Sequence, residues 1–148
     1  MHVVEAGPVA GRPVVLVHGF PETWWSWRHQ MPALASAGFR AIAFDLRGYN
    51  RSDKPRGLSA YRLDRLAGDL RAVLDDAARE PVAVVAHDWG GAVAWWSAFL
   101  FPERIDPESL GPLRALLFDL RDTGAARAGA LVAAAGSRAT AASSTVGS

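Results

Sequence analysis

Three short, nearly continuous apolar runs alternate with segments of helical periodicity, and this alternation strongly constrains the fold. The runs cover residues 14–17, 39–44 and 82–86. Strands of this kind are buried on both faces, as in a parallel sheet with helices on each side. Residues 2–6 are expected to form one more short strand, and apolar residues recur at helical spacing in 22–37, 61–79 and 90–101. We therefore predict an α/β fold with a mostly parallel sheet.

The composition excludes several classes of protein. The chain has 148 residues, of which 50% are hydrophobic and 21% charged, and its formal net charge of +1 indicates no nucleic-acid partner. It contains no cysteine, so it has neither disulfides nor a thiolate metal site. No apolar run approaches the ~18 residues that span a bilayer, and the N-terminus does not resemble a signal peptide. We expect a cytoplasmic protein without a membrane partner, and the sequence leaves its oligomeric state undetermined.

The segment Ala86-His87-Asp88-Trp89-Gly90 joins the third apolar run to the following helix. A strand, a sharp turn and a helix, with small residues flanking a central nucleophile, is the layout of a nucleophile elbow. Here the nucleophile would be the Asp88 carboxylate, which attacks an electrophilic carbon and forms an ester. Ala86 and Gly90 are the flanking small residues, and Gly91 would allow the helix to pack closely against the strand. The alternative is that Asp88 only caps the helix.

A second motif, His18-Gly19-Phe20-Pro21, follows the first apolar run. Because the carboxyl ends of parallel strands share one edge of the sheet, this turn should lie beside the elbow. The backbone N–H groups of Phe20 and Trp89 are then the expected pair that stabilises an oxyanion. Read alone, the motif is an ordinary Gly-Pro turn with His18 hydrogen-bonded in it.

Other polar and aromatic residues are assigned structural roles. The loop Asp45–Asp53 follows the second apolar run, and Arg47 and Asp53 are expected to hold it by bonds from their side chains to the backbone. His29 is expected to be a surface or packing residue. Most of the tryptophans in the predicted helices should pack in the interior; these are residues 24, 25, 27, 95 and 96.

The three motifs together resemble the N-terminal half of an α/β-hydrolase-fold epoxide hydrolase, over roughly residues 2–105. They are His18 to Gln30, Asp45 to Pro55 and His87 to Gly91. The resemblance implies a hydrolase of ether bonds that acts on a small apolar epoxide with water as co-substrate, without cofactor or metal. In that family an aspartate opens the epoxide, a histidine oriented by an acid activates water, and two cap tyrosines donate protons to the epoxide oxygen. It also implies a cis Phe20–Pro21 peptide bond.

The chain departs from this family after residue 105. Its four histidines are His2, His18, His29 and His87, so no general-base histidine follows Asp88. Both tyrosines also precede Asp88, so neither has the position of a cap tyrosine. We predict residues 1–105 to be the N-terminal part of a hydrolase core that lacks the cap and C-terminal strands. Residues 106–148 would form a divergent tail, rich in Ala, Gly, Ser and Thr and disordered from about 123. A truncated or frameshifted epoxide hydrolase with no or very low turnover is the favoured interpretation.

Two other functions remain open at this point. A haloalkane dehalogenase shares the nucleophilic aspartate and the following tryptophan, but it usually has asparagine at the position of Phe20. A non-catalytic α/β module that binds a small apolar ligand or a partner chain is the second alternative, since an incomplete sheet exposes an edge that can pair.

Overall fold

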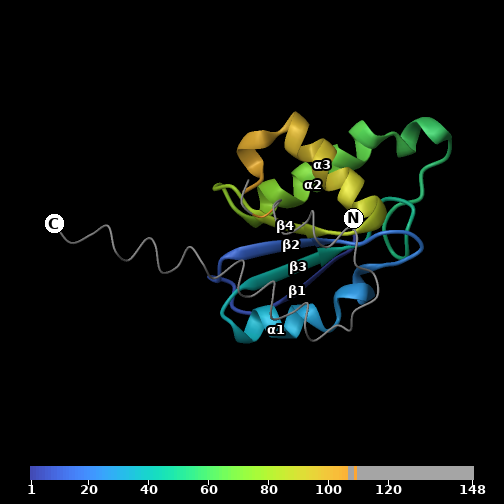
Figure 1. The fold of residues 1–148 in the computed structure, drawn as a ribbon. Coiled ribbons are helices and arrows are strands. Elements are labelled where there is room, and N and C mark those ends of the chain that lie inside the picture. The colour runs from blue at the N-terminus through green and yellow to red at the C-terminus, as the bar shows by residue number, and fades with distance from the viewer. Residues whose placement is uncertain (107–108, 110–148) are drawn as a thin grey trace.

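A four-stranded sheet with helices on both faces forms the centre of the molecule (Figure 1). The structure is a computed structural model and describes residues 1–106 and 109. The strands are β1 (Val3–Ala6), β2 (Pro13–Val17), β3 (Arg40–Phe44) and β4 (Ala83–Ala86). The α-helices are α1 (Gln30–Ser36), α2 (Leu63–Ala77) and α3 (Asp88–Leu100), and 3-10 helices cover Trp24–Trp27, Leu58–Tyr61 and Pro102–Arg104.

The strand order β1-β3-β2-β4 places β2 in the interior of the sheet. β2 pairs in parallel with β3 on one side and β4 on the other, so that Val15 lies opposite both Ile42 and Val84. β1 pairs antiparallel with β3. α1 covers one face, and α2 and α3 cover the other (Figure 1). The chain thus reverses its direction of winding beside β2, and open α/β sheets bind ligands at the carboxyl ends of strands at such a point.

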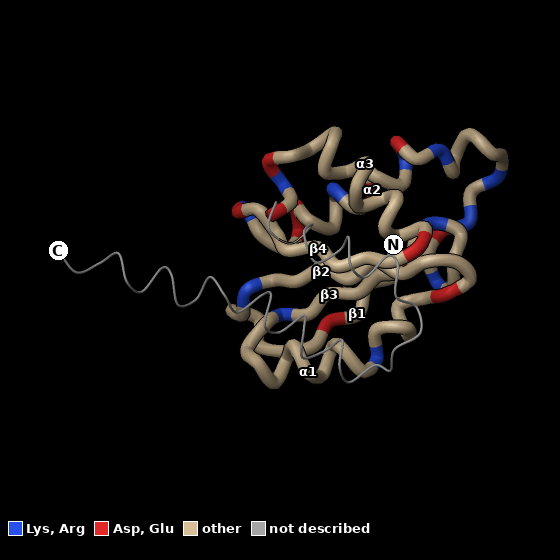
Figure 2. The backbone as a smooth tube through the Cα atoms, in the orientation of Figure 1, with Lys and Arg blue, Asp and Glu red and all other residues tan. Residues whose placement is uncertain are grey.

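The core confirms the predicted buried strands. The side chains of β2, β3 and β4 are almost wholly enclosed, together with Leu34 of α1 and Leu70 and Leu74 of α2. Acidic and basic residues are interspersed along the rest of the described chain (Figure 2). No helix among the described residues is long and apolar enough to cross a membrane.

The prediction of one helix over 22–37 is wrong, because this segment forms the 3-10 helix Trp24–Trp27 and then α1. Pro32 explains the break, since its ring would clash with the carbonyl of Arg28 in a continuous helix, whereas the first turn of α1 accepts it. Thr23, which the sequence suggests as the cap of this segment, caps the 3-10 helix Trp24–Trp27, because its Oγ1 accepts from the Trp25 N–H at 3.3 Å.

The other predicted helices are displaced at their ends. Ser59, which the sequence suggests as the cap of the helix over 61–79, lies inside the 3-10 helix Leu58–Tyr61 and does not cap α2, which begins at Leu63 after the extended residue Arg62. α3 begins at Asp88 itself, two residues before its predicted start. The sequence over 114–120 is compatible with a strand or a helix, and both this segment and the expected disorder from about 123 lie outside the described residues. The domain division at 105/106 stays a prediction.

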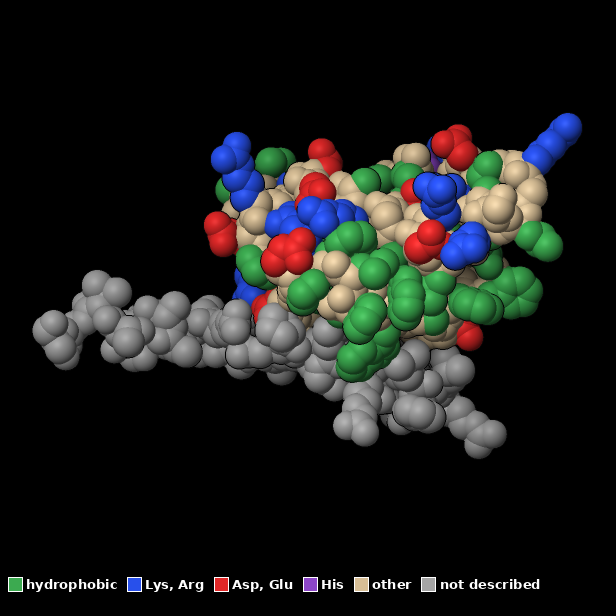
Figure 3. Space-filling model, turned by 90° about the horizontal axis from the view of Figure 1, so that it is seen from above, with side chains coloured by type: hydrophobic (Ala, Val, Ile, Leu, Met, Phe, Trp, Pro, Cys, Tyr) green, Lys and Arg blue, Asp and Glu red, His purple; other side chains and the backbone are tan. Residues whose placement is uncertain are grey.

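The outer face of α3 is open in the described part of the chain, and the outer edge of β4 is only partly covered. Val82, just before β4, forms a parallel bridge with Ile105, and the Val84 N–H donates to Ser109 Oγ at 3.2 Å. Trp95, Trp96, Phe99 and Leu100 on α3 are exposed, and Figure 3 shows hydrophobic side chains gathered on the face that carries α2 and α3. The expectation that most of the tryptophans pack inside is therefore wrong: Trp27 is buried and Trp24 half-buried, but Trp25, Trp95 and Trp96 are not.

Arg104 closes the C-terminal end of α2. Its buried guanidinium donates to the carbonyls of Leu74, Ala78 and Arg79 and pairs with Asp75 at 2.7 Å. The last carbonyls of a helix lack partners within the helix, and a cation is favourable beside them.

Arg104→Ala should lower the free energy of unfolding by about 3 kcal/mol, because several buried carbonyls would lose their donors. Urea unfolding followed by circular dichroism measures the change. Arg71→Ala is the matched control, since Arg71 pairs with the same Asp75 from a more exposed position at 3.4 Å and should cost less than about 1 kcal/mol. Equal effects of the two substitutions would contradict the capping role.

Candidate active site

The backbone bends sharply at Asp88, between β4 and α3. Asp88 has φ 51°, in the left-handed region that a side chain rarely adopts. Such a conformation persists only where the surroundings enforce it, and it is common at functional sites. The predicted strand, sharp turn and helix are therefore present, and Asp88 is the first residue of the helix.

Two glycines allow this turn to approach β2. A β-carbon at Gly90 would lie 2.4 Å from the carbonyl oxygen of His18 and 2.5 Å from that of Val17. A β-carbon at Gly19 would lie 2.5 Å from the β-carbon of Asp88. Glycine is therefore required at both positions, which were identified in the sequence as parts of two separate motifs.

The Asp88 carboxylate is exposed and is held by backbone donors. The Phe20 N–H donates to Oδ1 at 2.8 Å across a sequence separation of 68 residues. Hydrogen bonds from the N–H groups of Phe20 and then Trp89 lower the pKa of Asp88 below its ordinary value. The backbone N–H groups of Phe20 and Trp89, which the sequence predicts to stabilise an oxyanion, thus both donate to the Asp88 carboxylate.

The loop that carries Phe20 contains a cis peptide bond between Phe20 and Pro21, as the resemblance implies. A backbone hydrogen bond from the Glu22 N–H to the carbonyl of Gly19, at 2.9 Å, closes the turn. The Phe20 N–H in this turn points to Asp88, while Phe20 itself is 64% exposed.

The two histidines beside the turn are held by other groups. His18 is fully buried: its Nε2 accepts from the Leu46 N–H at 2.9 Å, so Nδ1 carries the proton and donates to the carbonyl of Gly19 at 2.8 Å. Burial lowers the pKa of His18 and favours this neutral form. His87 places Nε2 2.8 Å from Glu22 Oε2, and its ring packs edge-on against Trp27.

The remaining two histidines, His2 and His29, lie elsewhere. His2 contacts Asp45, and His29 is exposed immediately before α1, as expected of a surface residue. All four histidines of the chain are thus bound to groups other than Asp88 or exposed. Residues 1–106 and 109 also contain no group of His, Asp and Glu side chains that could hold a metal ion.

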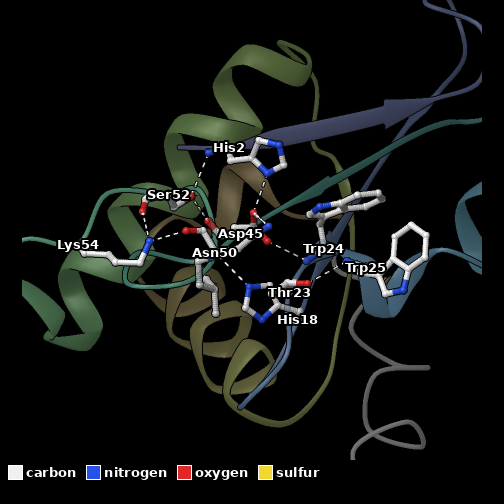
Figure 4. Close-up of polar contacts among 10 residues, drawn as sticks. His2, His18, Thr23, Trp24, Trp25, Asp45, Asn50, Ser52 and Lys54 are labelled. Carbon is white, nitrogen blue, oxygen red and sulfur yellow. Dashed lines mark hydrogen bonds and ion pairs between the residues drawn. The ribbon is translucent and has the colours of Figure 1, made fainter.

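Asp45 is a structural centre that the sequence reasoning did not single out. Its fully buried carboxylate accepts from His2 Nδ1 at 2.6 Å, from the Trp24 N–H at 2.9 Å and from Asn50 Nδ2 at 2.9 Å (Figure 4). Ser52 Oγ donates to its carbonyl at 2.6 Å. The sequence does contain a signal for this role, which is an aspartate directly after a buried strand with Asn50 and Ser52 in the loop that follows. Asp45 therefore ties the N-terminus, the 3-10 helix and the loop together behind the active site.

The rest of the loop after β3 is fastened to α2. Arg47 forms a double hydrogen bond with Asp69, at 2.6 and 2.8 Å, and donates to the carbonyl of Ala60 at 3.1 Å. The last contact is of the kind expected for Arg47. Asp53 differs from the expectation, since it contributes its own carbonyl, which accepts from the Gly48 N–H at 2.9 Å.

An aspartate with a strained backbone, whose carboxylate accepts from two backbone donors at the carboxyl ends of parallel strands, is the geometry of a hydrolase elbow. Residues 12–106 match the family model described as alpha/beta hydrolase fold, and the chain belongs to this family.

The most informative relatives are epoxide hydrolases. Epoxide hydrolase B of Mycobacterium tuberculosis is 54% identical over 106 residues, which are 70% of this chain and 30% of that protein. The AB hydrolase superfamily protein YfhM of Bacillus subtilis is 47% identical over 72% of this chain and 37% of its own. The crystal structure of epoxide hydrolase A from Mycobacterium thermoresistibile matches with a TM-score of 0.66 and 48% identity, over 70% of this chain and 32% of that one. The chain thus spans about a third of the length of these relatives.

Proposed function

We propose that Asp88 opens an epoxide by attacking a ring carbon, which leaves a 2-hydroxyalkyl ester on the protein. The observation that carries this proposal is the Asp88 carboxylate itself, ionised, exposed and held by the Phe20 N–H at 2.8 Å. The similarity to epoxide hydrolases supports the choice of an epoxide.

The two backbone donors would serve both chemical states of Asp88. In the free protein they bind the carboxylate and keep it ionised. When one carboxylate oxygen has bonded to carbon, they remain directed at the other oxygen, which is the carbonyl oxygen of the ester. Attack by water on that ester would place negative charge on this oxygen, where the same two N–H groups would stabilise it.

Hydrolysis of the ester requires a base that activates water, and the four histidines of this chain are bound to other groups or lie away from Asp88. Loss of a general base costs about 10²–10⁴-fold in rate. We therefore expect the ester to persist on this chain by itself, so that the isolated chain reacts once and turns over very slowly or not at all. We also propose a cytoplasmic location, which cell fractionation would test.

Incubation with styrene oxide tests the proposed function. The mass of the intact protein should increase by one epoxide per chain, and peptide mapping should locate the addition on Asp88. Asp88→Asn should abolish the adduct, because a neutral amide is a poor nucleophile. Asp53→Asn is the control, since Asp53 is an exposed carboxylate on the loop after β3 and its loss should leave the adduct unchanged.

The pH dependence of alkylation gives a second test. Because the pKa of Asp88 is lowered, the reactive carboxylate is lost only when the pH falls through that lowered value. The rate of attack by the carboxylate should therefore be constant from about pH 8 down to about pH 5. A rate that falls between pH 7 and 6 would assign the reaction to an imidazole, and steady formation of diol would contradict the persistence of the ester.

The same measurement of intact mass tests the alternative that the chain acts as a haloalkane dehalogenase. Reaction with an alkyl bromide and none with styrene oxide would favour that activity over the epoxide reaction. A ligand that binds equally well to the Asp88→Ala variant would favour the non-catalytic binding module.

A further inference from the structure

α3 directs small side chains toward the interior and large apolar side chains outward. Its buried residues are Gly90, Gly91, Val93, Ala94 and Ser97. The exposed residues from its second turn onward are all apolar, and we call them the α3 stripe: Ala92, Trp95, Trp96, Phe99 and Leu100. A helix that is apolar on every side is typical of a position covered on every side. The α3 stripe is therefore a surface on which a further element can pack.

The α3 stripe carries no charge, and paired charges flank its C-terminal end. The sequence has no charged residue between Trp89 and Phe101. The guanidinium of Arg71 lies 4.6 Å from the centroid of the Phe101 ring and is 3.4 Å from the carboxylate of Glu103. An apolar centre beside a polar rim is typical of interfaces between proteins. Two identical stripes can meet without repulsion between like charges, whereas a charged partner would bury its charges unpaired.

The order of residues along the α3 stripe is complementary to an inverted copy of itself. Trp95 and Trp96 lie in the middle, Ala92 lies three residues before Trp95, and Phe99 lies three residues after Trp96. Spacings of three and four residues form the ridges and grooves through which two helices pack. In an antiparallel pair with a two-fold axis between Trp95 and Trp96, each Phe99 ring faces Ala92 of the other copy. The small alanine leaves room for that ring.

The area of the α3 stripe fits a weak dimer. A large aromatic side chain presents roughly 150–250 Å², so the exposed fractions of the stripe amount to roughly 400–500 Å² per copy. Two copies would bury roughly 800–1,000 Å², just below the range of about 1,200–2,000 Å² for stable interfaces. The rings of Trp96 and Phe99 are already stacked, with their centroids 5.4 Å apart and their planes at 25°. This arrangement reduces the side-chain freedom lost on contact.

We propose that the α3 stripe is a homodimer interface, in which a second copy of this chain packs its α3 antiparallel to the first. Phe99 of each copy covers Ala92 of the other, and the four tryptophans at positions 95 and 96 surround the two-fold axis. Because the buried area is at the lower limit for a specific interface, the dimer forms at micromolar concentrations of chain. The proposal is independent of the reaction proposed for Asp88.

Sedimentation velocity of the full chain, over a series of micromolar concentrations, measures the association. The mass should rise from one chain to a plateau at two chains. Phe99→Ala should weaken the dimer about 10²-fold, because each dimer loses two rings. Leu58→Ala is the matched control, since Leu58 is an exposed apolar residue on a 3-10 helix outside the stripe and should leave the association unchanged. A chain that stays monomeric, or one that associates without stopping at two, would overturn the proposal.

An exchange of side-chain size tests the antiparallel geometry. Ala92→Phe enlarges the apolar surface and would strengthen nonspecific association, but it fills the room for Phe99 and should weaken the dimer about 10-fold. Combining Ala92→Phe with Phe99→Ala exchanges the large and small positions and should restore most of the affinity. Circular dichroism checks that each variant is folded, which we expect because both side chains are exposed in the single chain. Tighter association of Ala92→Phe, or a double variant as weak as Phe99→Ala, would overturn the proposal.

Discussion

Asp45→Ala is expected to lower the free energy of unfolding by about 4 kcal/mol, which is a large part of the roughly 5–15 kcal/mol by which a typical domain is stable. The substitution leaves the Trp24 N–H, His2 Nδ1 and Asn50 Nδ2 without their common acceptor. The backbone N–H is the most costly of these, because it cannot turn toward water. Circular dichroism in increasing urea measures the change.

Two further variants separate this effect from a general loss of charge. Asp53→Ala removes an exposed carboxylate from the same loop and should change stability by less than about 0.5 kcal/mol. Asp45→Asn retains an oxygen that can accept from Trp24 and should lose about half as much stability as Asp45→Ala. An Asp45→Ala protein as stable as Asp53→Ala would show that the buried carboxylate does not organise the loop.

Gly90→Ala should destabilise the protein by about 3 kcal/mol and abolish alkylation of Asp88. The added β-carbon would lie 2.4–2.5 Å from two backbone oxygens of the segment that ends β2, and backbone cannot rotate away as a flexible side chain can. α3 must therefore move outward, and Asp88, two residues earlier, moves away from the Phe20 N–H. Urea unfolding and intact mass after treatment with styrene oxide measure the two effects.

Gly68→Ala provides a control of opposite sign. Gly68 lies within α2 and is exposed, and a β-carbon there would meet no atom within 4 Å. Alanine has the higher helix propensity, so this variant should be more stable by about 0.5–1 kcal/mol and should still be alkylated. If Gly90→Ala were tolerated as well as Gly68→Ala, close packing of α3 on β2 would not explain the glycine after the turn.

The buried strands and their shared edge were predictable from sequence because their signal is local. Runs such as Val14–Val17 have one physical explanation, which is burial on both faces. The meeting of Phe20 and Asp88 followed from the parallel strands, since their carboxyl ends converge. Pro32 was a readable signal for the break before α1, but the apolar spacing across 22–37 outweighed it in the prediction.

The contacts of Asp45 and Arg104 could not be predicted in the same way. His2 and Asp45 are 43 residues apart, and Arg104 and Leu74 are 30 apart. Neither pair carries a local pattern, and each forms only because the folded sheet brings distant segments together. The exposure of Trp95 and Trp96 was missed for a related reason, since apolar content indicates burial only when another element covers the helix.

The tryptophans also determine what intrinsic fluorescence can report for this chain. Trp27 is the one buried indole of the six, whereas Trp25, Trp89, Trp95 and Trp96 are 39–57% exposed in the folded state. Unfolding changes the surroundings of these four indoles less than those of Trp27, so the emission maximum should shift less than in a protein whose tryptophans are all buried. Trp89 adjoins Asp88, and an aromatic group attached there would alter its emission. Fluorescence should therefore follow the chemistry of Asp88 more sensitively than it follows the loss of the fold.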